Sequence, residues 1–175
     1  MEIKKEMYIS IKNNDIIKVK ELLDNDKSNV NIETPFGSLL HVAAMYNRLD
    51  IAKLLINYGI DINKKSGVID AAAIKKAATK GNINIVKYLI CVGAELDTST
   101  AEANPLFGAI YGNHIDIVEL LIDNGINIGV KYHLYNIKNM DAYNYAIEGG
   151  NLKIANLIKE KMLEQGLEVV NIFEK

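Results

Sequence analysis

The chain has 175 residues, of which 49% are hydrophobic and 24% charged, a composition that excludes a wholly disordered protein. Its formal net charge of −2 gives no general attraction to nucleic acid or to an anionic membrane. The lone cysteine, Cys91, excludes an internal disulfide and favours a reducing compartment. No apolar run approaches the length of a membrane span, and no apolar stretch follows the first residues as in a signal peptide. We therefore expect a cytoplasmic protein without a membrane partner.

A block of apolar residues recurs along the chain with nearly constant spacing. It occupies residues 51–63, 85–97 and 117–128. Repetition at a period of about 33 residues is typical of stacked-repeat architectures. Such repeats present an extended surface rather than one deep catalytic pocket. The period therefore predicts a class of fold and a class of function together.

Each repeat is expected to contain two helices joined by a turn at Gly or Asn. The predicted turn residues are Asn14, Asn47, Gly81, Asn113 and Gly150. Gly and Asn most readily adopt the left-handed backbone that ends a helix. Small residues precede each turn and allow close helix approach, and an amphipathic stretch follows it. Glycines are expected to end three of the second helices: Gly59, Gly93 and Gly125.

The sequence Ser-Leu-Leu-His-Val-Ala-Ala at residues 38–44, continuing to Asn63, resembles the ankyrin repeat. Residues 72–97 and 104–129 resemble it as well. The resemblance implies an all-α ankyrin-repeat solenoid of helix-turn-helix repeats with finger loops, in a single domain over residues 1–175. The expected repeats are approximately residues 4–31, 34–63, 67–97, 100–129 and 137–163, followed by a C-terminal extension, residues 164–175.

The terminal repeats depart from the family pattern in ways that suit capping repeats. The first repeat has Lys18 and Glu21 where inner repeats have apolar residues. The fifth has Asp141-Ala142 in place of Thr-Pro and is expected to lack a glycine after its second helix. Outer faces of end repeats must meet water, which favours polar residues there. The extension is expected either to pack on the last helix or to bind a partner as a short strand.

The finger loop before the fifth repeat is longer than the others by about four residues, placed between Val130 and Asn139. This insertion contains Tyr132, His133 and Tyr135. Loop tips tolerate insertions, so neutral drift is one interpretation. Exposed aromatic residues favour the alternative, which is contact with a partner.

The residues that could support catalysis have simpler explanations. The resemblance implies that His41 bonds the backbone of the neighbouring finger loop and that His114 fills a structural turn position. Cys91 follows an apolar helical stretch, and no His or Cys cluster has metal-ligand spacing. We therefore expect no enzymatic activity, no metal and no cofactor.

Charge is distributed unevenly among the repeats. The fourth has no Lys or Arg, and its predicted second helix carries Asp116, Glu119 and Asp123. Basic residues gather earlier, in a finger loop and on a first helix: Lys64, Lys65, Lys75, Lys76 and Lys80. One interpretation is an ordinary solvated surface. The other is a basic face that attracts a partner with an acidic patch.

Ankyrin proteins bind partners through finger-loop tips and exposed positions of the first helices, so the resemblance implies a partner-binding surface on the concave face. The candidate residues are Met45, Tyr46, Lys64, Lys65, Lys76, Thr79, Lys80, Tyr111, Tyr132, His133, Tyr135 and Glu148. Tyrosine suits this role because it offers a large contact area and a polar tip.

The expected function is therefore non-enzymatic protein–protein interaction by a chain that is monomeric alone. Residues 104–112 and 139–142 are similar to small bacterial ankyrin proteins that serve as immunity partners of secreted toxins. This similarity implies an inhibitor that covers a toxin domain. The alternatives are a general scaffold or host-directed effector, and a binder of an anionic ligand or nucleic acid. Near-neutral charge and a single arginine disfavour the last.

Overall fold

The computed structural model describes residues 2–174, which form two compact units. The first unit comprises residues 2–77 and 82–95, and the second comprises residues 78–81 and 96–174. Met1 and Lys175, the ends of the predicted domain and extension, lie outside the described residues. No helix within residues 2–174 combines the length and the apolar character that a membrane crossing requires.

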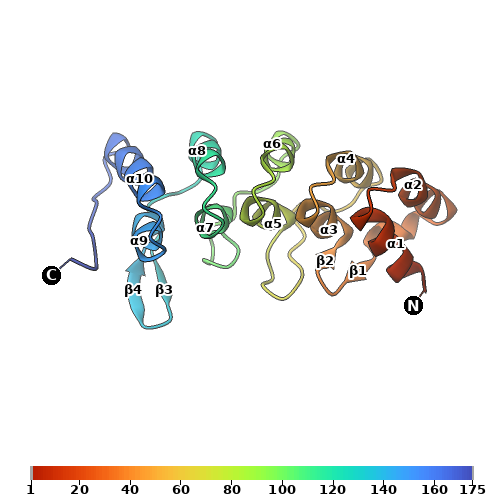
Figure 1. Ribbon diagram of the computed structural model, residues 1–175, viewed down its shortest axis with the longest axis horizontal. Coiled ribbons are helices and arrows are strands. Elements are labelled where there is room, and N and C mark those ends of the chain that lie inside the picture. The colour runs from red at the N-terminus through yellow and green to blue at the C-terminus, as the bar shows by residue number, and fades with distance from the viewer. Residues whose placement is uncertain (1, 175) are drawn as a thin grey trace. The chain divides into compact units, whose positions relative to one another are not determined.

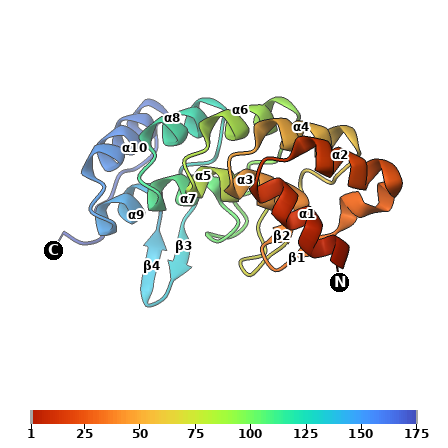
Figure 2. The ribbon, with the colours of Figure 1, turned by 45° about the vertical axis from the view of Figure 1, so that its right-hand side comes forward.

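The first unit consists of helix pairs with loops between them. Its helices are α1 (Glu2–Lys12), α2 (Ile16–Asn25), α3 (Leu39–Met45), α4 (Leu49–Asn57), most of α5 (Ala73–Thr79) and α6 (Ile83–Cys91), with a 3-10 turn, η1 (Lys27–Asn31). The first finger loop pairs β1 (Glu33–Thr34) with β2 (Gly37–Ser38), antiparallel. The second closes with a single bridge between Ser66 and Ala71. Within this unit α2, α4 and α6 form a layer on α1, α3 and α5, and the finger loops project from the opposite side (Figures 1 and 2).

The second unit repeats the arrangement. Its helices are α7 (Pro105–Tyr111), α8 (Ile115–Asp123), α9 (Ala142–Glu148) and α10 (Leu152–Glu164). The lengthened finger loop forms an antiparallel hairpin of β3 (Tyr132–Leu134) and β4 (Ile137–Met140), with an irregularity between Tyr132 and Leu134. This hairpin projects beyond α9, on the side away from α10 (Figure 2). The predicted all-α class with finger loops is confirmed.

The predicted turn residues all have left-handed backbone geometry. Their φ angles are 62° at Asn14, 56° at Asn47, 76° at Gly81, 57° at Asn113 and 71° at Gly150. Gly59, Gly93 and Gly125 also have positive φ and follow α4, α6 and α8, as predicted. The prediction that the fifth repeat lacks such a glycine is wrong. Its second helix, α10, has 13 residues against 9 in α8, and Gly166, with a φ of 70°, follows it.

At three of the turns, the side chain that follows the turn residue bonds the backbone of the preceding repeat. In the first unit Arg48 donates through Nη2 to the carbonyl oxygen of Lys12 at 2.7 Å. Asn82 donates through Nδ2 to the carbonyl of Ala44 at 2.6 Å. In the second unit Asn151 donates to the carbonyl of Ile110 at 2.9 Å. These bonds satisfy carbonyls at the ends of first helices, which have no partner within their own helix.

The core within each unit is aliphatic, with small residues on the first helices. Ala43, Ala77, Ala109 and Ala146 are fully buried. Larger side chains from the second helices fill the space beside them, including Leu55, Leu89 and Leu121. Alternation of small and large residues allows close packing of neighbouring helices. This packing fixes the spacing at which successive finger loops emerge.

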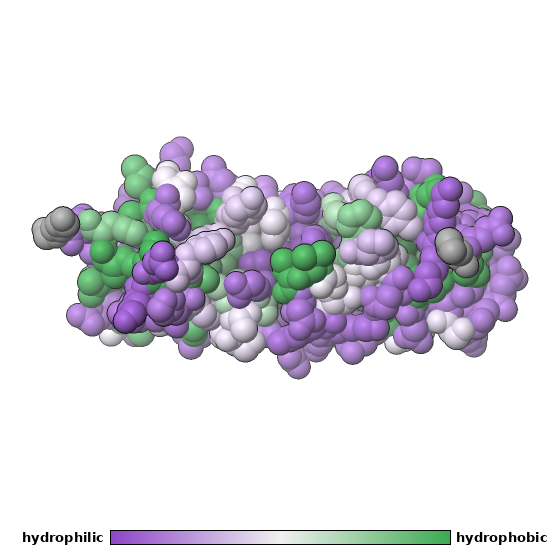
Figure 3. Space-filling model, turned by 90° about the horizontal axis from the view of Figure 1, so that it is seen from below, coloured by the Kyte–Doolittle hydropathy of each residue, from purple (hydrophilic) through white to green (hydrophobic). Residues whose placement is uncertain are grey.

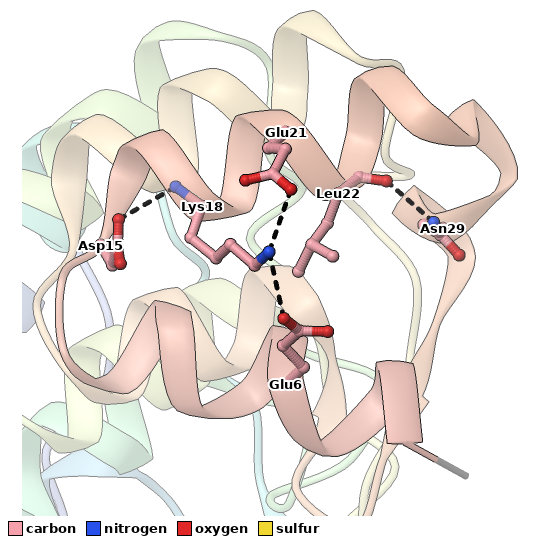
Figure 4. A network of polar contacts seen from close by, with 6 residues as sticks. All are labelled: Glu6, Asp15, Lys18, Glu21, Leu22 and Asn29. Atoms are coloured by element: carbon pink, nitrogen blue, oxygen red, sulfur yellow. Dashed lines mark hydrogen bonds and ion pairs between the residues drawn. The ribbon is translucent and has the colours of Figure 1, made fainter.

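The first repeat carries a polar network on its outer side (Figure 4). The Lys18 ammonium lies 3.2 Å from Glu6 on α1 and 3.0 Å from Glu21 on α2. Asp15 caps α2 by accepting a hydrogen bond from the backbone N–H of Lys18 at 2.9 Å. Partly exposed ion pairs contribute only about 0–1 kcal/mol each, so this network adds little to the stability of the first repeat.

The C-terminal extension packs against the last repeat through Asn144. This buried side chain donates through Nδ2 to the carbonyl of Val170 at 2.9 Å and accepts from the N–H of Ile172 at 3.0 Å. Asp141, the cap of α9, fixes Asn144 by accepting from its backbone and side-chain nitrogens at 2.9 and 2.8 Å. The extension therefore covers the end of the second unit.

Two glycines at equivalent positions give a matched test of packing. A Cβ on Gly112, which caps α7, would lie 2.6 Å from the carbonyl oxygen of Thr79 and 2.5 Å from the His114 ring. A Cβ on Gly149, which caps α9, would meet nothing closer than 3.3 Å. We predict that Gly112→Ala lowers the free energy of unfolding by about 2–3 kcal/mol, because a backbone carbonyl cannot move cheaply.

Gly149→Ala should change the unfolding free energy by less than about 1 kcal/mol. Urea denaturation followed by circular dichroism measures both variants. Equal effects at the two positions would contradict the packing described around His114.

Candidate functional site

The second finger loop is fixed to the first unit by His41. The ring of His41 is buried and lies 2.7 Å from the carbonyl oxygen of Ala71 through Nε2. Its Nδ1 lies 2.8 Å from Oγ of Ser38. Burial lowers the pKa of His41, and in the neutral ring Nε2 donates to the carbonyl while Nδ1 accepts from the hydroxyl. The structural role expected for His41 is confirmed.

A small groove lies between the tips of the two finger loops of the first unit. It has a volume of about 80 Å³ and is lined by Pro35, Phe36, Val68, Ile69, Ala72 and Lys76, with the His41 ring also on its wall. Val68 is 98% exposed and Phe36 43% exposed. Small-molecule and cofactor sites have volumes of roughly 300–1,000 Å³, so the groove is too small for one. It has room for about one side chain.

An aromatic cluster adjoins the groove. The ring of Tyr8 on α1 stacks on Phe36 with centroids 5.4 Å apart, and meets Tyr46 edge-on at 6.2 Å. The hydroxyl groups of Tyr8 and Tyr46 are hydrogen-bonded at 2.7 Å. The Lys12 ammonium lies 5.9 Å from the Tyr46 ring centre. Tyr46 therefore has internal contacts in addition to its predicted role in partner binding.

A second group of aromatic side chains, here called the tyrosine surface, lies in the second unit and comprises Tyr111, Tyr135 and Tyr145. Tyr145 stacks on Phe107 at 4.6 Å. Tyr111 is 75% exposed at the end of α7, and Tyr135 is 94% exposed at the hairpin turn. Burial raises the pKa of the Tyr145 hydroxyl, and the nearby Glu148, Tyr111 and Tyr135 raise it further. Glu148, Tyr111 and Tyr135 therefore each act electrostatically on Tyr145.

Tyr132 is half-buried at the base of the same hairpin. Its hydroxyl donates to the carbonyl of Thr98 at 2.8 Å and accepts from Nδ2 of Asn104 at 3.0 Å. Its ring meets Phe107 edge-on at 5.1 Å. Burial raises the pKa of this hydroxyl. Tyr132 thus anchors the hairpin, which places Tyr135 at the exposed tip.

The remaining predicted residues fall in both units. In the first, Lys76 lines the groove, Met45 is half-buried at the end of α3, Lys65 is exposed, and Lys64 forms an ion pair with Glu33. In the second, Thr79 is half-buried, and the others are exposed: Lys80, His133 and Glu148. Whether these residues contact a partner stays a prediction.

Lys75 does not join the exposed basic face expected from the sequence. Its side chain lies inward and only 8% of the residue is accessible. On a helix, residues one position apart point about 100° away from each other, so Lys75 and its neighbour Lys76 cannot share one face. Lys76 is therefore the lysine of α5 that reaches the groove. Asp116, Glu119 and Asp123 are exposed on α8, as predicted.

The exposed apolar tips, Phe36, Val68 and Ile69, were missed by sequence reasoning. A signal was present, because Pro35-Phe36-Gly37 and Gly67-Val68-Ile69 place apolar residues beside turn-forming ones. Figure 3, which views the side from which the finger loops project, shows hydrophobic patches within a mainly hydrophilic surface. Within residues 2–174 no group of His, Cys, Asp and Glu side chains could hold a metal ion.

Comparison with protein families agrees with this architecture. A family profile described as ankyrin repeats (3 copies) matches residues 74–169, more than half of the chain, and one described as ankyrin repeats (many copies) matches residues 40–90. The chain belongs to the ankyrin-repeat family. Ankyrin repeats act as protein–protein interaction scaffolds and are generally non-enzymatic.

Similar proteins occur in bacteria and eukaryotes. An ankyrin repeat protein of Rickettsia felis is 33% identical over 143 residues, which are 81% of this chain and 31% of that protein. The ankyrin repeat and SAM domain-containing protein 6 of Rattus norvegicus is 37% identical over 45% of this chain and 9% of its own length. A palmitoyltransferase of Lachancea kluyveri is 29% identical over 63% of this chain and 16% of its own length. The ankyrin chain thus spans less than a third of each relative.

The environment of His41 predicts a pH dependence of stability. Burial lowers the pKa of His41 and outweighs the hydrogen bond to Ala71 and the Glu33 carboxylate, which raise it, while the Lys76 and Lys64 ammonium groups lower it further. The unfolded chain, with an ordinary histidine pKa of about 6.5, therefore takes up the proton first as the pH falls. The stability linked to neutral His41 is complete above about pH 6.5 and decreases between that pH and the lowered pKa.

We predict that His41→Gln removes this decrease, because an amide can still donate to Ala71 but does not titrate. His133→Gln, on the exposed hairpin, should preserve it. Urea denaturation from pH 7.5 to pH 5 tests both variants. An unchanged pH profile for His41→Gln would show that another group causes the dependence.

Proposed function

We propose that the chain is a non-enzymatic protein-recognition module whose finger-loop tips and first-helix ends contact the partner. The observation that carries this proposal is the location of exposed aromatic side chains. Within residues 2–174, the clearly exposed aromatic residues are Phe36, Tyr111, Tyr135 and Phe173. None of them lies on the second helix of a repeat. Aromatic residues exposed on rigid elements are favoured as binding hot spots, since they give contact area at little entropic cost.

The two units offer different chemistry to a partner. The first presents apolar tips and the Lys76 ammonium around the groove. The second presents tyrosines with the Glu148 carboxylate, and its repeat over residues 100–129 contains no Lys or Arg. A partner must therefore match a basic surface in one unit and an acidic surface in the other. A protein with the wrong charge pattern would place like charges against each other, which favours specific binding over general adhesion.

The finer proposal is that the partner is a toxin domain, which the chain inhibits by covering its active site. It rests on the similarity of residues 104–112 and 139–142 to bacterial immunity proteins. Cytoplasmic location is part of this proposal, and the lone exposed thiol of Cys91 suits a reducing compartment. Co-expression with the products of neighbouring genes tests it: rescue of growth supports inhibition, and association without rescue supports a scaffold instead.

The tyrosine surface gives a direct test of partner recognition. With a partner captured from the native cell and then purified, Tyr111→Ala and Tyr135→Ala should each weaken binding by about 1–3 kcal/mol in isothermal titration calorimetry. Because both side chains are exposed, thermal stability should stay within a few degrees of the parent chain.

Tyr88→Ala is the matched control, since Tyr88 lies on the second helix α6 and its ring packs under Lys53. It should leave the affinity unchanged. If Tyr88→Ala weakens binding while Tyr111→Ala and Tyr135→Ala do not, the partner binds through the second helices. That result would contradict the proposed binding surface.

A further inference from the structure

We infer that the groove of the first unit binds a short extended segment of the partner protein in which an aliphatic side chain stands next to a carboxylate. The inference rests on the proposed function and assigns the chemistry of one contact. It concerns the site between the tips of the first two finger loops, lined by Phe36, Val68, Ile69 and Lys76.

The apolar part of the segment follows from the size and lining of the groove. About 80 Å³ is room for one side chain and too little for a cofactor. Phe36, Val68 and Ile69 present apolar atoms to water in the free protein. Burial of such surface releases about 25 cal/mol per Å², so an aliphatic side chain is the ligand that this lining favours.

The carboxylate follows from Lys76. This lysine is the charged residue of the groove wall, and no acidic residue lines the groove within residues 2–174. Glu33 of the first finger loop is already paired with Lys64, and its other carboxylate oxygen accepts from Ser66 at 2.6 Å. Lys76 itself has no ion-pair partner within residues 2–174. A carboxylate from outside the chain would pair with the ammonium of Lys76, a half-buried residue.

The groove is held open in the free protein, which lowers the cost of binding. Gly67 lies against the backbone of Phe36, where an added Cβ would be 3.2 Å from the carbonyl oxygen. The Ser66–Ala71 bridge closes the second finger loop, and His41 bonds the carbonyl of Ala71. Both walls are therefore fixed before a ligand arrives, and little conformational entropy is lost on binding.

Selection from a random linear peptide library displayed on phage tests the inference with the whole 175-residue chain. The expected consensus places Leu, Ile or Val beside Asp or Glu. A selected peptide should bind about tenfold more weakly to Lys76→Ala, which removes the cation, and to Val68→Asp, which places a charge at the apolar rim. Val68 is almost fully exposed, so this second variant keeps the fold.

Lys87→Ala is the matched control, because Lys87 is an exposed lysine on α6 of the same unit, away from the groove. Its affinity for the peptide should stay within about twofold of the parent chain. A reduction equal to that of Lys76→Ala would show general charge attraction and overturn the inference.

Two further outcomes separate this inference from the proposed function. In the first outcome, the selected peptides are basic, and their binding is lost in Tyr111→Ala but kept in Lys76→Ala. This result would show that the peptides bind the tyrosine surface. It would contradict the inferred peptide site in the groove and support the proposed protein-recognition function. In the second outcome, no peptide is enriched, which also contradicts the inferred peptide site in the groove. The proposed protein-recognition function is still tested separately by the calorimetry on the captured partner.

Discussion

Within each unit, the array depends on the short turn between the two helices of a repeat. A residue with positive φ, such as Asn47 or Asn113, reverses the chain and brings the next side chain against the preceding repeat. Arg48 and Asn151 use that position to bond a carbonyl at the end of the previous first helix. One backbone geometry therefore shapes the repeat and also joins it to its neighbour. Apart from α10, the helices are otherwise too short to be stable alone, since the longest of them, α1, has 11 residues and isolated helices need roughly 12–15.

The packing of the helices determines where the finger loops emerge, whereas the residues at the loop tips can vary. His41 bonds the base of the second finger loop, and Tyr132 bonds the base of the hairpin. The side chains at the tips, Val68 and Tyr135, are almost fully exposed and are not part of the core. Rigid bases with variable tips are the arrangement in which binding residues commonly occur, because the scaffold positions them without constraining their identity.

The sequence predicted features that depend on local geometry. The turn at Asn47 and the stop at Gly59 could be identified because few residues tolerate left-handed backbone. The glycine that follows α10 was missed, since Gly166 lies beyond the family spacing. Side-chain direction was less accessible: Lys75 and Lys76 are adjacent, yet only one reaches the groove. The groove itself could not be predicted, because it arises from the approach of two loops about 30 residues apart.

Asn144 stands three residues after the cap of α9, the same offset that separates His41 from the cap of α3. Where His41 holds the following finger loop, Asn144 holds the backbone at Val170 and Ile172. The segment after α10 thus lies against Asn144 in the way that a finger loop lies against His41. An engineer who wishes to lengthen the array would have to insert new repeats ahead of this piece. The segment after α10 could also be transferred to other arrays whose last repeat has asparagine three residues after the cap of its first helix.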